Sequence, residues 1–472
     1  MQRVVAKAAR AVMRLVYLVF LGVVLGVPSA RADVMLHAFN WRYADIGTQA
    51  QTIRDNGYRI VLVSPPLRSE GAAWWGRYQP QDYRVIDNPL GNTESFRTMI
   101  DQLGAKGVRV YADIVLNHMA NEAATRIDLD YPGRRILDIY RANPAYFSAN
   151  RLFGDLRFNF LSQWDFHEAR CIADYSNTFQ VQNWRLCMGA GDVGLPDLTD
   201  NDWVVSQQRA YLQALKALGV TGFRIDAAKH MSATQIARIF TTDVTSGMHV
   251  FGEVITSAGE GNDEYRLFLK PYLQNTNHGA YDFPLHGALR RAFSPAGSMS
   301  ELVDPLSTGQ ALLPARAITF TVTHDIPNNS IFRFMLLDPT DETLAYAYVL
   351  GRDGGVPLVY SDHNESGDNR WVDAYRRADL TAMIGFHNQL QGHDMQVLSH
   401  GACHLIFRRG SRGIVAINKC GQAQEAAVSM HNSVLWWHSP YRDVVTGSSL
   451  TIDRADFRFQ LPPRSARLWI RQ

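Results

Sequence analysis

Two charged residues interrupt an otherwise apolar stretch at residues 222–228, which Lys229 and His230 follow. Arg224 and Asp226 alternate with Phe223 and Ile225, so in a strand they point to the same side. A strand of a parallel sheet is covered by helices on both faces and is normally apolar throughout. Burying a guanidinium and a carboxylate costs solvation free energy, and such residues often belong to functional sites. A structural ion pair is the alternative explanation.

Three further apolar stretches end in polar residues in the same way. They span residues 110–118, 250–255 and 318–325, and their polar residues are Asn117, His118, Glu253, His324 and Asp325. Each stretch is short and rich in β-branched or aromatic residues. Polar residues at the carboxyl ends of successive parallel strands form the active site of a (β/α)8 barrel. Four such stretches in order, with helical segments between them, favour this α/β architecture.

These four stretches resemble the strand motifs of the α-amylase family of glycoside hydrolases, in the family's order. Residues 195–198, Leu-Pro-Asp-Leu, match a fifth motif of the family. The resemblance extends from about Asp33 to the C-terminus. It implies a (β/α)8 TIM barrel, a domain inserted after the third strand and a C-terminal antiparallel β-sandwich domain.

The resemblance implies three catalytic carboxylates. Asp226 matches the nucleophile of the family and Glu253 its general acid/base. Asp325 matches a third carboxylate that binds sugar hydroxyls and supports protonation of the acid. Retention of configuration requires the first two carboxyl groups to lie about 5–5.5 Å apart. Three carboxylates in one cleft repel, so at least one pKa should rise, whereas Arg224 should keep Asp226 ionised.

Other positions match residues that bind the sugar chain in this family. His118 and His324 match histidines at the cleaved position, where neutral imidazole can donate and accept hydrogen bonds. Residues 74–80 place two tryptophans and a tyrosine in a glycine-containing loop, where their rings could stack on pyranose C–H faces. A packed loop or a protein interface is the alternative. The expected substrate contacts are Trp74, Trp75, Tyr78, Gln79, His118, Arg224, Lys229, His230 and His324, with Lys229 contacting the next sugar.

The resemblance also implies a calcium ion that joins the inserted domain to the barrel. Calcium prefers oxygen ligands from carboxylates, amides and carbonyls. Asn117 and Asp197 match the side-chain ligands, and the carbonyl of His230 matches a third ligand. A further carbonyl is expected just before Leu186, and we assign it to Gln182. An amide that caps a strand end is the alternative role of Asn117.

Chloride is not expected as a cofactor. Some members of the family bind it beside Arg224 and need a second basic residue near the last strand. Residues 356–359 contain no Arg or Lys at the matching place, although Arg352 is close enough to leave the question open.

The first 32 residues have the composition of a signal peptide. Four basic residues precede an apolar run over residues 15–27, and residues 30–32, Ala-Arg-Ala, fit a cleavage site before Asp33. An uncleaved anchor is the alternative, but this run is too short for a bilayer core of about 30 Å. We therefore expect a protein secreted outside the cell, or into the periplasm.

Four cysteines lie beyond this leader in two close pairs. An exported chain meets an oxidising compartment, so the expected disulfides are Cys171–Cys187 and Cys403–Cys420. Closeness along the chain favours this pairing over the two others that are possible. The chain has no Cys-x-x-Cys spacing, which argues against a zinc site.

Strand and helix patterns predict three domains. The expected barrel strands are residues 34–39, 58–64, 108–115, 222–226, 249–254, 279–283, 318–323 and 356–361, and a helix is expected over residues 199–218. More than eighty residues separate His118 from Val204, too many for a structureless loop. We assign residues 33–118 and 205–387 to the barrel, 119–204 to the inserted domain and 388–472 to the C-terminal domain. The strands expected in the last are residues 402–408, 413–419, 426–430, 433–437 and 457–461, and the Cys403–Cys420 disulfide is expected to close the first hairpin of this domain.

Composition restricts the class of partner. Five Lys+Arg and no acidic residues lie in residues 1–32, so the mature chain has 42 basic and 45 acidic residues and a net charge of −3. This balance lacks the basic surface of a nucleic-acid-binding protein. We expect a monomer that binds a neutral polysaccharide and no membrane after cleavage.

The expected function is retaining endo-hydrolysis of α-1,4-glucosidic bonds in starch, glycogen and maltooligosaccharides. An exo-acting maltooligosaccharide-forming amylase and an α-glucan transglycosylase remain alternatives on the same fold. An inactive carbohydrate-binding protein is an alternative of another class, but it would not need all three carboxylates.

Overall fold

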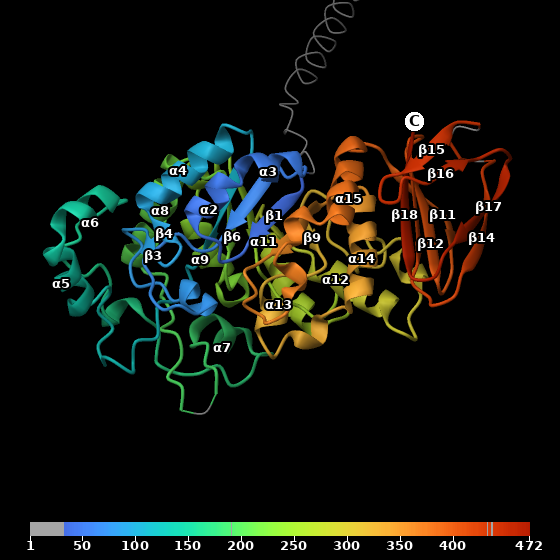
Figure 1. Ribbon diagram of the computed structural model, residues 1–472. Coiled ribbons are helices and arrows are strands. Elements are labelled where there is room, and N and C mark those ends of the chain that lie inside the picture. The colour runs from blue at the N-terminus through green and yellow to red at the C-terminus, as the bar shows by residue number, and fades with distance from the viewer. Residues whose placement is uncertain (1–32, 190, 432, 436–437) are drawn as a thin grey trace, which may run out of the picture. The chain divides into compact units, whose positions relative to one another are not determined.

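Eight parallel strands close into a barrel (Figure 1). The computed structural model describes residues 33–189, 191–431, 433–435 and 438–472, so the expected signal peptide lies outside the described residues. The barrel strands are β1 (Met35–Ala38), β2 (Ile60–Val63), β5 (Arg109–Ile114), β6 (Gly222–Ile225), β7 (His249–Gly252), β8 (Gly279–Tyr281), β9 (Ala317–Phe320) and β10 (Val356–Ser361). They follow one another in this order around the barrel, and β10 pairs with β1. All eight coincide with predicted strands, and the (β/α)8 fold is confirmed.

Helices connect the strands along the outside of the barrel, as the alternation of strand and helix patterns predicts. They are α2 (Tyr43–Thr48), α3 (Ala50–Asp55), α4 (Thr93–Gly104), α8 (Asp202–Ala217), α9 (Ala233–Ile239), α10 (Thr242–Thr245), α11 (Lys270–Asn275), α12 (Phe283–Phe293), α14 (Pro339–Gly351) and α15 (Ala378–Gln389). α8 begins three residues later than expected, because the side chain of Asn201 caps it by accepting a hydrogen bond from the amide of Val204. No helix of the described residues is long and apolar enough to cross a membrane.

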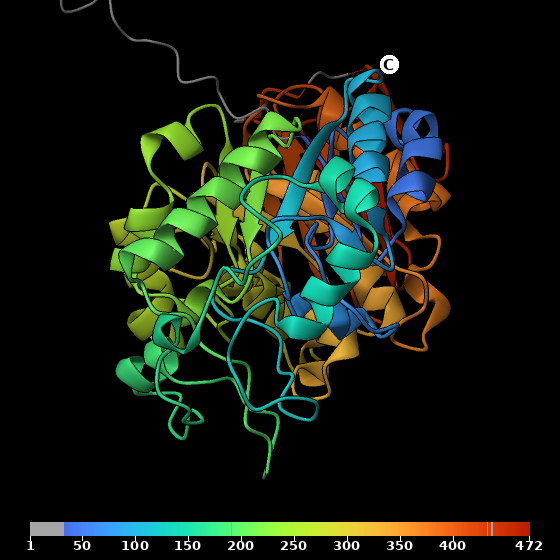
Figure 2. The ribbon, with the colours of Figure 1, turned by 90° about the vertical axis from the view of Figure 1, so that its left-hand side faces the viewer.

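The long connection between β5 and α8 carries its own elements, and Figure 2 shows it in teal and green, from helices at the middle of the view to loops at its lower edge. It contains α5 (Arg134–Ala142), α6 (Pro144–Asn150), α7 (Thr178–Asn183) and the Cys171–Cys187 disulfide. Four of its side chains form a small apolar core with Val85, which lies before α4: Ile136, Leu137, Tyr140 and Phe147. This connection therefore contains ordered elements, as its length predicts. The domain limits at 118, 204 and 387 stay a prediction.

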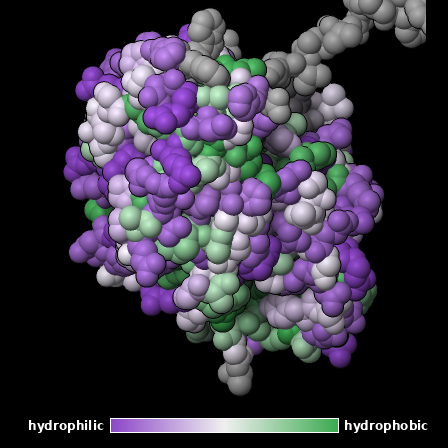
Figure 3. Space-filling view, turned by 90° about the vertical axis from the view of Figure 1, so that its right-hand side faces the viewer, coloured by the Kyte–Doolittle hydropathy of each residue, from purple (hydrophilic) through white to green (hydrophobic). Residues whose placement is uncertain are grey.

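Antiparallel strands form the C-terminal region. One sheet has the order β11 (Met395–His400), β12 (His404–Arg409), β13 (Gly413–Asn418), β18 (Ser465–Arg471), β15 (Pro440–Asp443) and β16 (Ser449–Thr451), and β14 (Gln424–Ser429) pairs with β17 (Asp456–Leu461). Apolar side chains from both groups pack together, among them Ile406, Ile414, Val428 and Phe459. Along β14 and β17 buried residues alternate with exposed ones, and Figure 3 shows hydrophobic residues scattered among hydrophilic ones on this side of the molecule.

Two details of the C-terminal prediction are wrong. The expected strand at residues 433–437 is absent from its described part, Ser433–Leu435, which is a loop. The side chain of Leu435 is buried in the core of the sandwich although its backbone lies in a loop. The Cys403–Cys420 disulfide forms as expected, but it closes the β12–β13 hairpin, which is the second hairpin because β11 and β12 form an earlier one.

Basic side chains of the C-terminal region bind carbonyls at the ends of barrel helices. The buried guanidinium of Arg409 donates to the carbonyls of Gly351, Arg352 and Leu390 at 2.6–2.8 Å, where α14 and α15 end. The ammonium of Lys419 donates to three carbonyls that follow or end α12, those of Ala292, Ser294 and Gly297. Helix ends leave carbonyls without partners inside the helix, and cations satisfy them well.

Candidate active site

Arg224 is the centre of a cluster of carboxylates inside the mouth of the barrel. Its side chain is fully buried on β6, and its register partner on β5 is Asp113. Nη1 donates to both oxygens of Asp113 at 2.7 and 2.8 Å and to Oδ1 of Asp226 at 2.8 Å. Nη2 forms an ion pair with Oε1 of Glu253. One guanidinium therefore holds three carboxylates from three neighbouring strands.

The backbone fixes the two carboxylates that follow β6 and β7. The amide of Asp226 donates to the carbonyl of Ile114 and the amide of Glu253 to that of Ile225, both at 2.9 Å, so the ladder continues past the strand ends. Ala227 then turns the chain with a φ of 48°, a left-handed conformation that costs an alanine about 1 kcal/mol. Its amide lies 3.4 Å from Oε2 of Glu253. The turn after β6 therefore contacts the carboxylate after β7.

Asp325 reaches the same cluster from β9. It begins the short helix α13 (Asp325–Asn328), five residues beyond the strand. A hydrogen bond to Glu253 and repulsion from the other carboxylates accompany its burial. The structure thus brings Asp226, Glu253 and Asp325 together, as the sequence motifs predict.

The charges in this cluster do not balance, because a single guanidinium faces four carboxyl groups. Burial raises the pKa of Asp226, and Arg224 opposes this shift. Burial also raises the pKa of Glu253, with the Asp226 charge adding to the effect. Burial and the neighbouring Glu253 raise the pKa of Asp325 well above its usual value. The site therefore retains protons at a pH where exposed carboxylates have lost them.

Aromatic rings surround His324 on the β1 side of the site. The Tyr78 ring stacks on His324 at 5.1 Å between centroids and the Phe39 ring at 4.6 Å. The Tyr78 hydroxyl donates to Oδ2 of Asp113 at 2.9 Å. Trp74 contacts the same rings, with centroids 6.0 Å from His324, whereas Trp75 is 55% exposed. Tyr78 and Trp74 thus belong to the packed wall of the site, and Trp75 faces outward.

The two histidines of the motifs are neutral and keep one free ring nitrogen each. Burial lowers the pKa of His118 and lowers that of His324 well below the usual value. Nε2 of His118 donates to the carbonyl of Tyr78 at 3.0 Å. Within the described part of the chain, Nδ1 of His118 and Nδ1 of His324 are buried without a hydrogen-bond partner. Buried polar atoms are normally paired, so these two nitrogens suit a polar ligand.

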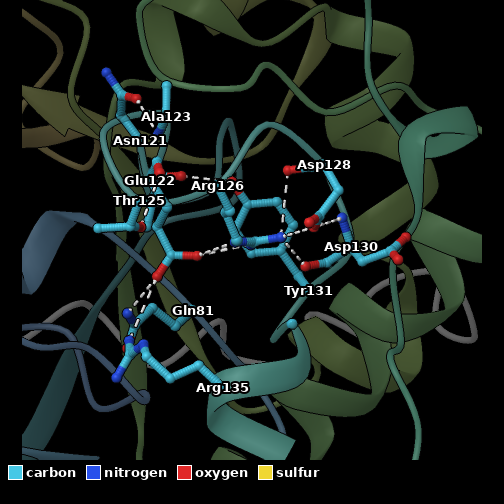
Figure 4. Close-up of polar contacts among 12 residues, drawn as sticks. Gln81, Asn121, Glu122, Ala123, Thr125, Arg126, Asp128, Asp130, Tyr131 and Arg135 are labelled. Atoms are coloured by element: carbon cyan, nitrogen blue, oxygen red, sulfur yellow. Dashed lines mark hydrogen bonds and ion pairs between the residues drawn. The ribbon is translucent and has the colours of Figure 1, made fainter.

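Polar contacts fasten the loop of residues 74–81 to the inserted segment. Oε1 of Gln79 accepts a hydrogen bond from the amide of Asn121 at 2.7 Å, so this side chain holds the loop itself. Figure 4 shows the neighbouring network around Glu122, whose oxygens bind Gln81 at 2.6 Å and Arg126 at 2.7 Å. The Arg126 guanidinium lies over the Tyr131 ring at 4.5 Å. The aromatic loop is therefore anchored to residues far along the chain.

Lys229 and His230 lie in the 3-10 turn that follows Asp226. Lys229 forms an ion pair with Glu264 at 2.9 Å. Nδ1 of His230 donates to the carbonyl of Val181 at 3.0 Å, and burial lowers the pKa of His230 to about 3. The His230 contact ties α7 of the inserted segment to the end of β6.

The expected calcium ligands meet where the inserted segment returns to the barrel. Asn117 and Asp197 are buried, and Nδ2 of Asn117 lies 3.1 Å from Oδ1 of Asp197. The other oxygen of Asp197 contacts Nδ1 of His167 at 2.6 Å. Burial raises the pKa of Asp197, which a bound cation would offset. The amide oxygen and the carboxylate fit a hard cation.

The two expected carbonyl ligands, Gln182 and His230, lie on neighbouring segments. The Gln182 amide donates to the carbonyl of Met231 at 3.5 Å, which puts α7 beside the turn that carries His230. In the described residues no group of three or more His, Cys, Asp or Glu side chains could hold a metal, but the predicted set contains one carboxylate. Arg352 is the basic residue near the last strand that was considered for a chloride site. Its guanidinium carbon lies 5.7 Å from the centre of the Tyr348 ring.

Asp113, His37 and Phe39 belong to the site but were missed from the sequence. Asp113 lies inside an apolar strand, and the same alternation that singled out Arg224 could have found it. The fully buried His37 packs edge-on against His324 at 5.4 Å. Its position near the N-terminus gave no local signal, because only closure of the barrel by β1 and β10 brings it here.

The comparisons with known proteins agree on one family. Residues 46–264 match the family model described as the α-amylase catalytic domain. An α-amylase of Aeromonas hydrophila is 54% identical over 441 residues, which cover 93% of this chain and 95% of that protein.

Solved structures show the same fold. α-Amylase I of the earthworm Eisenia fetida matches with a TM-score of 0.74 at 23% identity, covering 93% of this chain and 97% of that one. A glutamate-to-glutamine variant of the same earthworm enzyme, solved with maltohexaose, matches with a TM-score of 0.69 at 22% identity over the same shares.

Proposed function

Since this chain belongs to the α-amylase family of glycoside hydrolases, we propose that it hydrolyses internal α-1,4-glucosidic bonds of starch, glycogen and maltooligosaccharides with retention of configuration. The maltohexaose bound by the earthworm variant supports a linear α-glucan as the substrate. The net charge of −3 of residues 33–472 suits a neutral polymer.

One observation carries the mechanism: Asp226 and Glu253 both bind the guanidinium of Arg224. Two carboxylates that pair with one guanidinium lie on the same side of the barrel mouth, which supports the retaining reaction, in which no water has to fit between them. We assign Asp226 as the nucleophile because its motif matches the family's nucleophile, and Arg224 opposes the rise in its pKa that burial causes. Its oxygen would bond to the anomeric carbon while the bond to the leaving oxygen breaks.

Glu253 is the proposed general acid. Its buried carboxyl has a raised pKa, so it holds the proton that the leaving oxygen requires. After the first sugar leaves, the ionised Glu253 removes a proton from water, and the water oxygen displaces Asp226 from the anomeric carbon. Asp325 would accept hydrogen bonds from sugar hydroxyls. Repulsion between the carboxylates of Asp325 and Glu253 would also keep one proton on this pair.

Neutral imidazoles and aromatic rings would bind the glucan around these carboxylates. The free Nδ1 atoms of His118 and His324 suit hydroxyls. We assign Trp74, Tyr78 and the exposed Trp75 to the wall against which pyranose rings pack, and Gln79 to its support. Lys229 and His230 would bind the next sugar.

Calcium is the proposed structural cofactor. Asn117 and Asp197 would supply side-chain oxygens, and His230 and Gln182 would supply carbonyls. Bound there, the cation supplies electrostatic cross-linking between the inserted segment and the barrel. We further propose that the protein is secreted after removal of residues 1–32, because two disulfides stabilise it.

Glu253→Gln tests the function most directly. The amide keeps the shape of the side chain but has no proton to give, so turnover of amylose should fall by at least about 1000-fold. Wild-type enzyme should release mixed oligomers from amylose early in the time course, as internal attack requires. Products are measured by chromatography.

Binding provides the control for this variant. Glu253→Gln should still bind maltoheptaose with an affinity that calorimetry can measure, because the wall of the site is intact. Unchanged turnover by the variant would remove Glu253 from the role of acid, and a single short product from the wild type would contradict internal attack.

A further inference from the structure

Glu264 joins the two turns that follow the proposed nucleophile and the proposed acid. Its Oε1 lies 2.9 Å from Nζ of Lys229. Its Oε2 accepts hydrogen bonds from the amide and the hydroxyl of Ser257 at 3.0 and 3.2 Å. Lys229 stands three residues after Asp226, and Ser257 stands four residues after Glu253. A single carboxylate therefore spans the rim between β6 and β7.

The ammonium of Lys229 is held from several sides. Besides Glu264, its Nζ lies 3.4 Å from the carbonyl of Ile255 and 5.1 Å from the centre of the Phe268 ring. Glu264 and Phe268 are four residues apart on one helical stretch, so both contact Lys229 from the same face. The Lys229 side chain is only 10% exposed, whereas that of Glu264 is 39% exposed. The lysine is therefore buried at this rim, and the glutamate is partly exposed.

An ammonium has three N–H donors. In the described part of the chain, Glu264 and the carbonyl of Ile255 accept two of them. The third remains for a ligand. A lysine side chain has four rotatable bonds, and fixing it before a ligand arrives lowers the entropy cost of binding.

We propose that Glu264 is a positioning residue, which holds Lys229 in place to bind the glucose unit next to the one being cleaved. This inference rests on the proposed function and deepens it. Glu264 does not touch the reacting atoms, and its effect passes through Lys229. Removing its charge should weaken ground-state binding of the glucan and leave the chemical step unchanged.

The variants are Glu264→Gln, Glu264→Asp and, as the matched control, Asp263→Asn. Asp263 is the adjacent acid, its side chain is 80% exposed, and it pairs with Arg266 on the same helix at 2.9 Å. For Glu264→Gln we expect KM for maltoheptaose to rise about tenfold, with kcat within about twofold of wild type. Glu264→Asp should recover part of the loss, and Asp263→Asn should match wild type.

The division between KM and kcat separates positioning from a structural role. Glu264 links the turns that carry Asp226 and Glu253, so a general loosening of the rim would lower kcat and the melting temperature. A lower kcat with unchanged KM, or wild-type kinetics in Glu264→Gln, would overturn the inference.

Binding separates this inference from the proposed function. Maltoheptaose affinity is measured by calorimetry in the Glu253→Gln background, with and without Glu264→Gln. A Kd about tenfold higher in the double variant supports the role of Glu264, even if the wild type proves not to hydrolyse the chain. An equal Kd, or no binding by either protein, refutes it.

Discussion

At the scale of single residues, the sequence predicts which carboxylates meet and misses how they are held. Asp226 and Glu253 were found because each follows an apolar strand, and strand ends converge in a barrel. The bidentate contact of Asp113 with Arg224 could not be predicted, because it depends on the register between β5 and β6.

Buried carboxylates elsewhere should make stability depend on pH. Asp282 caps α12 by accepting from the amide of Leu285, and its burial raises its pKa from 3.8 to about 6. The pKa of Asp282 is higher in the folded state than in the unfolded state. Its contribution to the free energy of unfolding is therefore fully present below pH 3.8 and is lost as the pH rises through 6, where the buried carboxyl ionises. Between pH 4.5 and 7.5 the loss should be about 2 kcal/mol.

Asp282→Asn isolates this contribution. The variant can still accept the capping hydrogen bond but cannot ionise. Between pH 4.5 and 7.5 the free energy of unfolding of wild type should therefore fall by about 2 kcal/mol more than that of the variant. Urea unfolding at both pH values measures the difference, with the exposed Asp138→Asn as control. An equal pH dependence in wild type and Asp282→Asn would contradict the assignment.

At the scale of elements, hydrophobic periodicity predicts the barrel strands well. It fails where burial has another cause, as at Leu435, which lies in a loop and is buried in the sandwich core. The strands β11, β15, β16 and β18 were missed. β15 and β16 have four and three residues, too few to show a clear alternation. The elements of the inserted segment are short as well, and polar contacts such as those of Glu122 hold them in place (Figure 4).

Calcium removal should loosen this inserted segment. If free calcium exceeds its Kd a thousandfold, its removal costs about 4 kcal/mol of stability. The melting temperature in EDTA should therefore fall and should recover when calcium is added back. Calorimetry measures both, and Asn117→Ala should respond less than wild type. A melting curve that EDTA leaves unaltered would count against the site.

At the scale of the whole molecule, cations of the C-terminal region complete the helices of the barrel. Neither helical patterns nor charge patterns predict these contacts, because the acceptors are backbone carbonyls from distant parts of the chain. The Arg409 side chain alone binds carbonyls at the ends of α14 and α15 and that of His393.

Arg409→Met should therefore destabilise the barrel as well as the C-terminal sheets. The variant leaves several buried carbonyls without a donor, which should cost at least about 3 kcal/mol. Calorimetry should show one transition for the wild type and one at lower temperature for the variant. Arg454→Met, at a side chain that is 73% exposed, is the matched control. Two separate transitions in the wild type would show that the two regions unfold independently.

The pairing of β1 with β10 sets the time at which the site can assemble. Met35 lies opposite Leu358 in this pair, more than 300 residues further along the chain. Until a ribosome has synthesised the residues of β10, β1 lacks one of its two neighbours and the ring of strands stays open. His37 then has no Tyr360 beside it. An incomplete chain should therefore have no glucan-cleaving activity, and a cell that makes this enzyme would be protected from it until translation is nearly finished.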